Sequence, residues 1–408
     1  MSTLPSRSDI CIIGAGPAGA TASLFLCKMK IPHTIIDAAV FPRDKVCGDA
    51  LDLKVMRVLN QLDPGLVERE IFNDPEFLKA SGCRIIISKN KTTTLLYQPK
   101  AGDLAYPFFL VSKRAHFDNF LVKKIDPAYA SFLQGTEVAK ITRREGIWKI
   151  NARKDNEDIE IQSKFIVGAD GDHSMVLRSV GERKINRAHY AGGVRQYWKG
   201  IQGLHEAGCL ELYFPKKLPL AYFWIFPLPG GEANVGCGLV SELISKNKVD
   251  LKDLLHRIIT EDPVIAPRFT DAVALEKTVG WGLPLASAKR NVCGDGWLLV
   301  GDAASLICPT TGEGIGPGMM SGCIAAHFIQ DAIAKKCFDE NIFKSYKREI
   351  TRRLQTDIKN FNRIRKLSPG IYNLGINMLT LTGLSGYIFK KKIAQWVSSA
   401  KKPIDINL

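Results

Sequence analysis

The chain has 408 residues, which is long enough for two or three domains with substantial hydrophobic cores. Its composition, with 46% hydrophobic and 24% charged residues, is that of an ordinary globular protein. The formal net charge of +15 suits an anionic cofactor or an anionic membrane surface, and because no nucleic-acid-binding motif is recognised, no nucleic-acid partner is expected.

Ten cysteines are scattered singly through the chain, with no CxxC pair and no zinc-like spacing. This pattern argues against disulfides and against a metal site, and it is typical of small residues buried in a reducing cytoplasm. Residues 1–9 are short and polar and include Asp9, so no signal peptide is predicted. We therefore expect a cytoplasmic protein that binds no metal.

The first elements of the chain have the order of a dinucleotide-binding unit. An apolar run at residues 10–13 enters a GxGxxG turn, a helix-compatible segment follows, and a second apolar run ends on an acid 23 positions after the first glycine. The glycines permit a tight turn, the approach of a pyrophosphate and close packing of helix on strand, while the acid accepts hydrogen bonds from a ribose. The phosphates would face the free amides and positive dipole end of the helix. The residues predicted to bind are Gly14, Gly16, Pro17, Ala18, Gly19 and Asp37.

A loop at residues 41–49 comes next, followed by a helical pattern through Leu59, a strand pair at 83–88 and 92–97, and a helix over 111–121 with Ser112 as its cap. From Gly135 to Val167, three strand-like runs alternate with polar turns, which predicts a β-meander. The last run leads into Asp170-Gly171.

The segment from about 184 to 285 changes character, with extended aromatic-rich runs at 209–214 and 221–227 and a single clear helix near 251–260. We interpret it as a second sheet domain inserted into the first. The chain then returns with a buried parallel strand at 297–302 and a long apolar helix over about 316–335.

The predicted fold class is α/β (α+β overall), with a Rossmann-like FAD/NAD(P)-binding domain, an inserted antiparallel-sheet substrate domain and a helical C-terminal tail. The expected domain ranges are 1–80, 100–183 and 286–338 for the discontinuous FAD-binding domain, 81–99 and 184–285 for the substrate domain, and 339–408 for the basic helical region.

The C-terminal region allows two interpretations. Leu367 to Phe389 lacks charges, but serine, proline, glycine and asparagine dilute it too much for a clear transmembrane helix. Basic residues bracket it, so it is either an interfacial segment on acidic lipid, giving peripheral contact at the cytoplasmic membrane face, or a helical tail packed on the protein.

A second glycine-rich stretch, residues 300–318, distinguishes between dinucleotide cofactors. A nicotinamide dehydrogenase needs one fingerprint, whereas an extended FAD needs a further strand end to hold its ribitol and diphosphate, and Asp302 suits that role. The glycines that follow would open a helix whose dipole stabilises negative charge on the reduced flavin. The predicted flavin-binding residues here are Gly301, Asp302, Gly312, Gly314 and Ile315.

With these motifs in view, the chain resembles the FAD-dependent family that includes p-hydroxybenzoate hydroxylase. That family is marked by GxGxxG near the start, a DG motif in mid-chain and a GD motif late, which Asp170-Gly171 and Gly301-Asp302 match. Arg114 matches the family's arginine at the start of a helix beside the flavin diphosphate. The resemblance implies FAD as cofactor and covers residues 8 to about 335.

Two further stretches are similar to the geranylgeranyl reductases within that family. Residues 43–49 resemble the KxCGG/KxCGD loop, which implies that Arg43, Cys47 and Gly48 bind the flavin. Residues 222–227, followed by Asn234-Val235-Gly236, resemble the YxWxFP signature. The resemblance implies saturation of isoprenoid double bonds, as in chlorophyll side chains, archaeal lipids or polyprenyl quinones. Flavin-dependent halogenases carry a GES-type triplet and a WxWxIP motif in place of these, and this chain has neither.

Reduction of an isolated alkene needs a hydride from reduced flavin, a proton for the other carbon and a long, dry, apolar pocket. Tyr222, Trp224 and Phe226 are the predicted substrate-binding wall, with Phe223, Tyr213 and Phe214 as further candidates, although all of them also suit the core of a sheet. Cys47 is the predicted catalytic residue, in proton transfer or positioning, and the neighbouring Lys45 and Arg43 would favour its thiolate. The alternative for a lone cysteine is inert packing.

The electron donor stays open between NAD(P)H and a ferredoxin, because no second Rossmann fingerprint is present. Two other functions stay open as well. One is a flavin monooxygenase acting on an apolar or aromatic substrate, and the other is a non-catalytic or electron-relay flavoprotein at a membrane.

Overall fold

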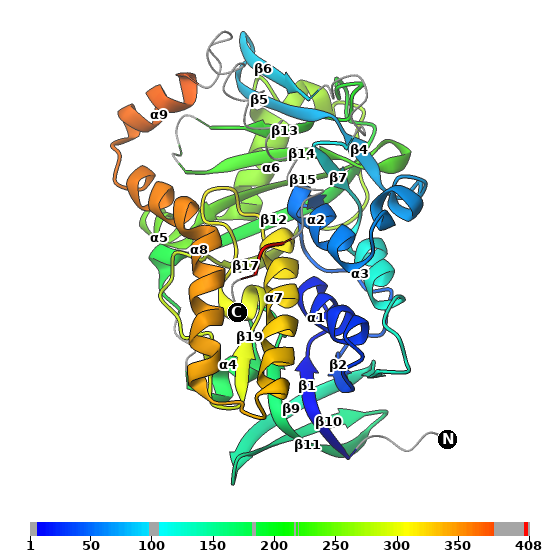
Figure 1. Ribbon diagram of the computed structural model, residues 1–408. Coiled ribbons are helices and arrows are strands. Elements are labelled where there is room, and N and C mark those ends of the chain that lie inside the picture. The colour runs from blue at the N-terminus through cyan, green and yellow to red at the C-terminus, as the bar shows by residue number, and fades with distance from the viewer. Residues whose placement is uncertain are drawn as a thin grey trace.

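The computed structural model describes residues 6–97, 106–181, 185–215, 218, 220–378 and 404–406. Within these ranges the chain folds around two large sheets and one small sheet (Figure 1). The helices are α1 Pro17–Lys28, α2 Leu53–Leu62, α3 Arg114–Val122, α4 Met175–Ser179, α5 Ser241–Lys246, α6 Leu251–Glu261, α7 Ile315–Ala334, α8 Glu340–Ile364 and α9 Pro369–Met378.

The first large sheet has a parallel centre, with the strand order β18-β19-β11-β1-β2-β8, and β10 and β9 attached in antiparallel fashion beside β11. Helices α1, α7 and α8 lie along it in Figure 1. The buried parts of its central strands are rich in apolar residues, Ile10–Ile13 in β1 and Ile35 and Ile36 in β2, as in other parallel sheets covered by helices. The strands are β1 Arg7–Ile13, β2 His33–Ile36, β8 Ala130–Leu133, β9 Thr136–Arg144, β10 Ile147–Lys154, β11 Glu157–Gly168, β18 Cys293–Gly294 and β19 Trp297–Leu299.

The predicted β-meander is confirmed as β9, β10 and β11. Both of its polar turns use the left-handed backbone region, at Glu145 and Gly146 in one turn and at Asp155 and Asn156 in the other. Glycine, aspartate and asparagine are the residues that tolerate this conformation best, so the turn chemistry fixes the hairpins locally.

The second large sheet has the strand order β16-β12-β15-β14-β13-β5-β6, with β17 also paired to β12. We expected an antiparallel sheet, and all its pairs are antiparallel except β13 with β5, which run parallel. Strands β5 and β6 come from residues 82–96 and join strands from residue 190 onward. The strands are β5 Gly82–Ser88, β6 Lys91–Leu96, β12 Tyr190–Lys199, β13 Leu210–Tyr213, β14 Tyr222–Pro227, β15 Glu232–Val240, β16 Val273–Ala274 and β17 Val279–Pro284.

A small sheet links the two parts. Strand β7 Phe109–Val111 pairs with β3 Ala50–Leu51 and β4 Leu78–Ala80, and it leads into α3. The prediction of Ser112 as the cap of this helix is wrong, because the chain is still extended at Val111, the helix begins at Arg114, and its N-cap is Lys113 without a side-chain hydrogen bond. The fold class itself, a Rossmann-like domain with a second sheet domain and a helical C-terminal region, is confirmed.

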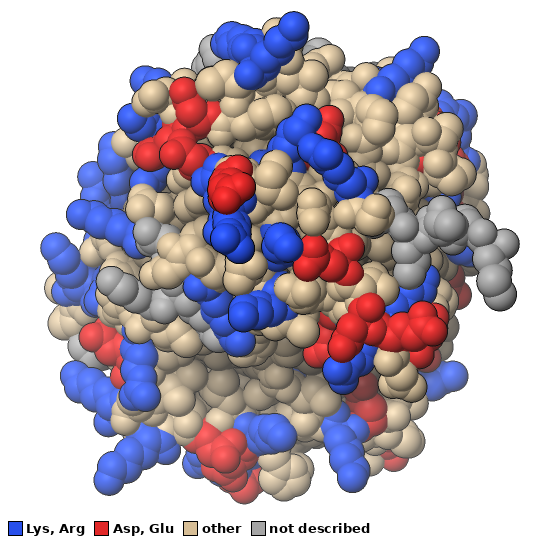
Figure 2. Space-filling view, turned by 90° about the horizontal axis from the view of Figure 1, so that it is seen from below, with Lys and Arg blue, Asp and Glu red and all other residues tan. Residues whose placement is uncertain are grey.

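Among the described residues, no helix is long and apolar enough to cross a membrane. Only the first part of the stretch Leu367–Phe389 is described, as the end of the α8–α9 connection and α9, and its remainder lies outside the described residues. Figure 2 shows the molecule from the end that carries the β9–β11 meander, where Lys and Arg side chains are spread over the face with Asp and Glu between them. On this face the positive charge is not gathered into one patch.

Candidate functional site

A cavity of about 1240 Å³ runs from the glycine turn before α1 to the second sheet. It is lined by residues of the first fingerprint, the loop at 41–49, the glycine-rich stretch before α7, and strand β14. Every binding residue predicted from the sequence except Gly19 lines it, namely Gly14, Gly16, Pro17, Ala18, Asp37, Arg43, Cys47, Gly48, Arg114, Asp170, Tyr222, Trp224, Phe226, Gly301, Asp302, Gly312, Gly314 and Ile315. The fold therefore brings together motifs that are up to 300 residues apart.

The three glycines of the first turn have the geometry that a dinucleotide requires. Gly14 has φ of +101°, and a Cβ there would lie 2.3 Å from the Ala169 carbonyl oxygen. At Gly19 a Cβ would lie 1.9 Å from the Gly14 carbonyl oxygen, so helix and turn touch at this point. At Gly16, Arg43 Nη2 at 3.7 Å is the one atom of the described residues within 4 Å of such a Cβ, which leaves the backbone open toward the cavity. This open backbone at the start of α1 is the place where a pyrophosphate would approach.

Asp37 directly follows β2, and its carboxylate orders the turn. Oδ2 accepts a hydrogen bond from Ala15 N at 2.7 Å, and Oδ1 accepts one from Ala39 N at 2.8 Å. Each carboxylate oxygen has a second lone pair, so both retain the capacity to accept a ribose hydroxyl.

Two arginines are held at the cavity by one buried carboxylate. Arg114 donates from Nε and Nη2 to the two oxygens of Asp118, both at 2.6 Å, and Arg43 donates to Asp118 Oδ2 at 2.7 Å. Asp118 is fully buried, so its charge needs these partners. The pair of guanidinium groups provides the positive potential that a diphosphate requires.

The DG and GD motifs end neighbouring strands. Asp170 follows β11, and its Oδ2 accepts from Met175 N at 2.6 Å and from Val176 N at 3.3 Å, while Oδ1 is buried without a partner in the described part of the chain. Asp302 follows β19, and its burial raises the pKa of its carboxyl, against the opposing charges of Lys45 and Arg114. These features of one cavity fit an extended FAD. They are the open backbone at Gly16, the two arginines, the partnerless Asp170 Oδ1 and the glycine-rich turn before α7.

The glycine-rich stretch before α7 contacts the second sheet. The helix opens at Ile315 with Gly314 as N-cap, one residue before the predicted start at about 316. Gly312 has φ of +74°, and a Cβ there would lie 2.6 Å from the hydroxyl of Tyr222, which donates a hydrogen bond to the Thr311 carbonyl at 3.0 Å. A residue larger than glycine would therefore push this tyrosine and the turn apart.

A carboxyl pair lies beside the same turn. Lys54 Nζ donates to Asp52 Oδ2 at 2.7 Å and to Glu313 Oε2 at 2.8 Å. Burial and the adjacent Asp52 raise the pKa of Glu313 well above its ordinary value, so one proton stays on this pair. The cluster ties the start of α2 to the turn before α7.

The aromatic residues of β14 alternate between two faces, because side chains in a strand have a period of two. Tyr222, Trp224 and Phe226 face the cavity, as predicted. Phe223 instead packs in the core of the second sheet, together with Tyr213, whose hydroxyl donates to Asp262 at 2.7 Å. The expectation that these two residues line the pocket is therefore wrong, whereas Phe214 does line it.

A single asparagine joins the aromatic wall to the cysteine loop. Asn234, on β15, is fully buried, and its Oδ1 accepts from Trp224 Nε1 at 2.9 Å. Its Nδ2 donates to the Cys47 carbonyl at 2.7 Å and to Asp49 Oδ2 at 2.8 Å, and Tyr197 also donates to that oxygen at 2.7 Å. The second sheet thus sets the position of the loop that the first domain provides.

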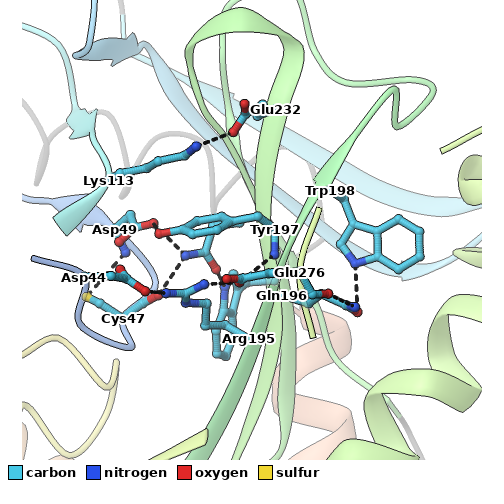
Figure 3. Close-up of polar contacts among 12 residues, drawn as sticks. Asp44, Cys47, Asp49, Lys113, Arg195, Gln196, Tyr197, Trp198, Glu232 and Glu276 are labelled. Atoms are coloured by element: carbon cyan, nitrogen blue, oxygen red, sulfur yellow. Dashed lines mark hydrogen bonds and ion pairs between the residues drawn. The ribbon is translucent and has the colours of Figure 1, made fainter. Parts of the chain in front are cut away.

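A second polar contact holds the same loop. Arg195, on β12, is 1% exposed and pairs with Asp44 of the loop and with Glu276, while its guanidinium lies 4.0 Å from the centre of the Tyr197 ring (Figure 3). Because the guanidinium itself is buried, separating the loop from the sheet would leave its charge with Glu276 alone of these two carboxylates.

Cys47 is not the activated thiolate that its basic neighbours predict. Burial raises the pKa of its thiol, and the Arg114 charge opposes this only in part. The ammonium of Lys45 is itself buried against the Trp281 ring, 3.3 Å from its centre, and burial lowers the pKa of Lys45 to about 8. A neutral thiol results, because desolvation outweighs the local positive charge. All ten cysteines are free.

Several residues of the site escaped the sequence reasoning. Asp49 stands in the loop that carries the reductase-like motif, and Asn234 begins the Asn234-Val235-Gly236 stretch that accompanies the aromatic signature, so membership in these motifs was a usable signal. Tyr197, Arg195 and Glu276 have no such signal, because only the pairing of β12 with its neighbours brings them to the loop.

The chain matches the family described as FAD binding domain over residues 7–198. Among curated proteins it is similar to the digeranylgeranylglycerophospholipid reductase of Thermoplasma acidophilum, with 26% identity over 352 residues that cover 85% of this chain and 84% of the relative. It is also similar to the menaquinone reductase of Mycobacterium tuberculosis, with 27% identity over 343 residues that cover 80% of this chain and 78% of the relative.

Among solved structures, a geranylgeranyl bacteriochlorophyll reductase-like protein from Thermoplasma acidophilum matches with a TM-score of 0.79 and 23% identity, over 97% of this chain and 98% of the other. A flavin-dependent brominase matches with a TM-score of 0.71 and 18% identity, over 96% and 99%. At these identities the two matches show a shared fold, which reductases and halogenases have in common.

Proposed function

We propose that this chain, an FAD-dependent oxidoreductase related to geranylgeranyl reductases, reduces carbon–carbon double bonds of an isoprenoid chain. The observation that carries this proposal is the hydrogen bonding of Asn234, which joins the cavity-lining Trp224 to the loop of Cys47. An apolar aromatic wall and a neutral thiol at one end of a cavity that fits FAD suit an uncharged, extended substrate better than a polar one. The curated relatives, a phospholipid reductase and a menaquinone reductase by name, support the same substrate class.

In this proposal the residues of the first fingerprint, together with Arg43, Arg114 and Asp302, hold the cofactor. Bound FAD would supply the hydride after its reduction by NAD(P)H or a ferredoxin. The chain itself binds and orients the substrate through Tyr222, Trp224 and Phe226 and excludes water from the reacting bond. This exclusion matters because a reduced flavin that meets oxygen and water loses its electrons unproductively.

Cys47 is proposed to contact the reacting double bond. Its neutral thiol is uncharged and polarizable, so it can lie against an alkene without the desolvation cost that a thiolate would carry. Cys47→Ala and Cys47→Ser are expected to bind FAD normally and to reduce prenyl substrate more slowly. Full turnover by both variants would remove the role proposed for this thiol.

The decisive experiment on function is mass spectrometry of isoprenoid lipids and quinones from cells with and without the gene. The proposal expects products that are heavier by two hydrogens for each reduced bond, and only in cells that carry the gene. Substrate-stimulated oxygen consumption with an oxygenated product would instead identify a monooxygenase and overturn the proposal.

We further propose that the protein works in the cytoplasm with peripheral contact to a membrane through its C-terminal region. Supporting this, α9 exposes Ile371 and Leu374, at 56% and 62%, one turn apart on one side of the helix. Exposed basic residues, Arg363 and Lys366, precede them. Sedimentation with phosphatidylglycerol vesicles tests this, and binding unchanged by Ile371→Asp with Leu374→Asp would contradict it.

A further inference from the structure

A buried carboxyl group, that of Asp49, lies on the cavity wall beside the proposed catalytic cysteine. Asp49 is 0% exposed, lines the cavity, and directs its backbone N–H at Cys47 Sγ over 3.4 Å. Its φ of +65° places it in the left-handed region, which aspartate tolerates better than most residues. The loop thus holds this side chain in one fixed orientation.

The two oxygens of Asp49 are in different environments. Oδ2 accepts hydrogen bonds from Tyr197 and Asn234, whereas Oδ1 is buried with no hydrogen-bond partner among the described residues. A buried carboxylate oxygen without a partner destabilises the protein, and a proton or a bound ligand removes this cost. Oδ1 is therefore the oxygen on which a proton is stabilised.

The surroundings of Asp49 act on the pKa of its carboxyl in opposite directions. Burial raises the pKa of the carboxyl to about 6, while Tyr197, Asn234, Arg195 and Arg114 favour the charged form. Cys47 is the remaining titratable neighbour in the loop. A carboxyl that gains and loses a proton close to neutral pH has the property that a general acid needs.

The proposed reaction requires such an acid. Burial makes the Cys47 thiol and the Tyr222 phenol weaker acids than usual, because it raises the pKa of both. Glu313 carries a proton, but its Oε2 is held by Lys54 beside Asp52 at the start of α2, and among the described residues none of its side-chain hydrogen bonds reaches the cysteine loop. Asp49 is part of the cysteine loop, and Asn234, which donates to its Oδ2, also accepts from Trp224 of the aromatic wall.

We propose that Asp49 is the catalytic acid, and that its Oδ1 carries the proton added to the substrate alkene. This inference rests on the proposed function. One alkene carbon accepts the hydride, and the π electron pair forms the second C–H bond with the Asp49 proton. The O–H bond breaks and its electron pair stays on the carboxylate, which Tyr197 and Asn234 stabilise. The alkene gains two electrons, the flavin loses two, and solvent returns a proton to Asp49 between turnovers.

The kinetic test follows reoxidation of the pre-reduced, FAD-loaded enzyme by geranylgeranyl diphosphate without oxygen. Asp49→Asn keeps an oxygen for Tyr197 and Asn234 but has no proton to give, so it should slow this step by at least 100-fold. The wild-type rate should fall as pH rises through the pKa of Asp49, and the variant should lose this pH dependence. Tyr197→Phe should keep the pH dependence but move it upward by about one pH unit, since it loses a hydrogen bond that favours the carboxylate.

Glu313→Gln is the matched control, because it makes the same change at the other protonated carboxyl of the cavity. It should leave the pH dependence of reoxidation in place. The proposal is overturned if Asp49→Asn reoxidises at the wild-type rate, or if Glu313→Gln abolishes the pH dependence in its stead. If Asp49→Asn does not fold, an unshifted pH dependence in Tyr197→Phe overturns it equally.

A second measurement needs no substrate and so separates this inference from the proposed function. Infrared spectroscopy of the folded protein should show a protonated-carboxyl band that titrates near pH 6 and is missing in Asp49→Asn. A spectrum without that difference overturns the acid role, even if the alkene is reduced. A wild-type protein that shows the band but reduces no alkene refutes the proposed function, and with it the catalytic use of the proton.

Discussion

The buried carboxyl of Asp49 leads to a prediction about stability whose test requires no substrate. Replacing it by asparagine keeps an oxygen that accepts from Tyr197 and Asn234, and it removes the ionisation. Burial raises the pKa of this carboxyl from 3.8 to about 6 in the folded protein, so folding favours its protonated form. Below pH 3.8 both the folded and the unfolded chain hold the proton, and the native state carries no penalty.

As pH rises from 3.8 to 6, the unfolded chain releases this proton and the folded chain retains it, so stability falls. Above pH 6 both states are ionised, and the full penalty for the wild type is about 3 kcal/mol. Asp49→Asn is therefore expected to be more stable than the wild type by about 3 kcal/mol at pH 8 and by about 1 kcal/mol at pH 4.5. With an unfolding entropy of about 2.1 cal/mol/K per residue, the gain at pH 8 corresponds to about 3 to 4 °C in Tm.

The assay is thermal unfolding of both proteins at pH 4.5 and pH 8, with FAD saturating in every sample. Asp158→Asn is the control, because it makes the same chemical change at a side chain that is 81% exposed and should shift Tm equally little at both pH values. A Tm difference between Asp49→Asn and wild type that does not grow from pH 4.5 to pH 8 would refute the reasoning. It would mean that the folded protein does not favour the protonated carboxyl.

Three further predictions concern the cofactor site and the loop. Gly14→Val and Asp302→Ala should each lose bound FAD, since one places a side chain against the Ala169 backbone and the other removes the acid at the second strand end. Flavin absorbance of the purified variants checks this, and stoichiometric FAD in both contradicts it. Cys47 should react with iodoacetamide more slowly than a free thiol at pH 8, because burial raises its pKa, so a fast reaction at pH 7 would show a thiolate. Asn234→Leu should destabilise the protein by about 2–5 kcal/mol, because it leaves buried donors and acceptors unpaired, and an unchanged Tm would argue against the loop contacts.

The first fingerprint and its partners could be read from the sequence because their chemistry is local. Residues within one short stretch decide its main features. These are Gly14 with φ of +101°, Pro17 at the start of α1 and Asp37 directly after β2. The polar turns of the meander and the inward side of β14 follow from the same kind of information, since turn residues and a period of two do not depend on distant contacts.

The parallel pairing of β13 with β5 joins segments more than 100 residues apart, and no local pattern specifies it. The charge state of Cys47 was mispredicted for a related reason. Its basic neighbours are visible in the sequence, but the desolvation that outweighs them depends on how deeply the fold buries the thiol.

The sequence by itself therefore determined which cofactor this protein is built to hold, because each FAD contact point is a short motif with its own backbone requirement. Only the tertiary structure decided what surrounds the cysteine loop. Asn234 lies 187 residues from Cys47 along the chain and Tyr197 lies 148 residues from Asp49, and each reaches the loop from the second sheet. Burial and hydrogen bonding from distant strands set the pKa of Asp49, and these are properties of the packed molecule, not of the motif.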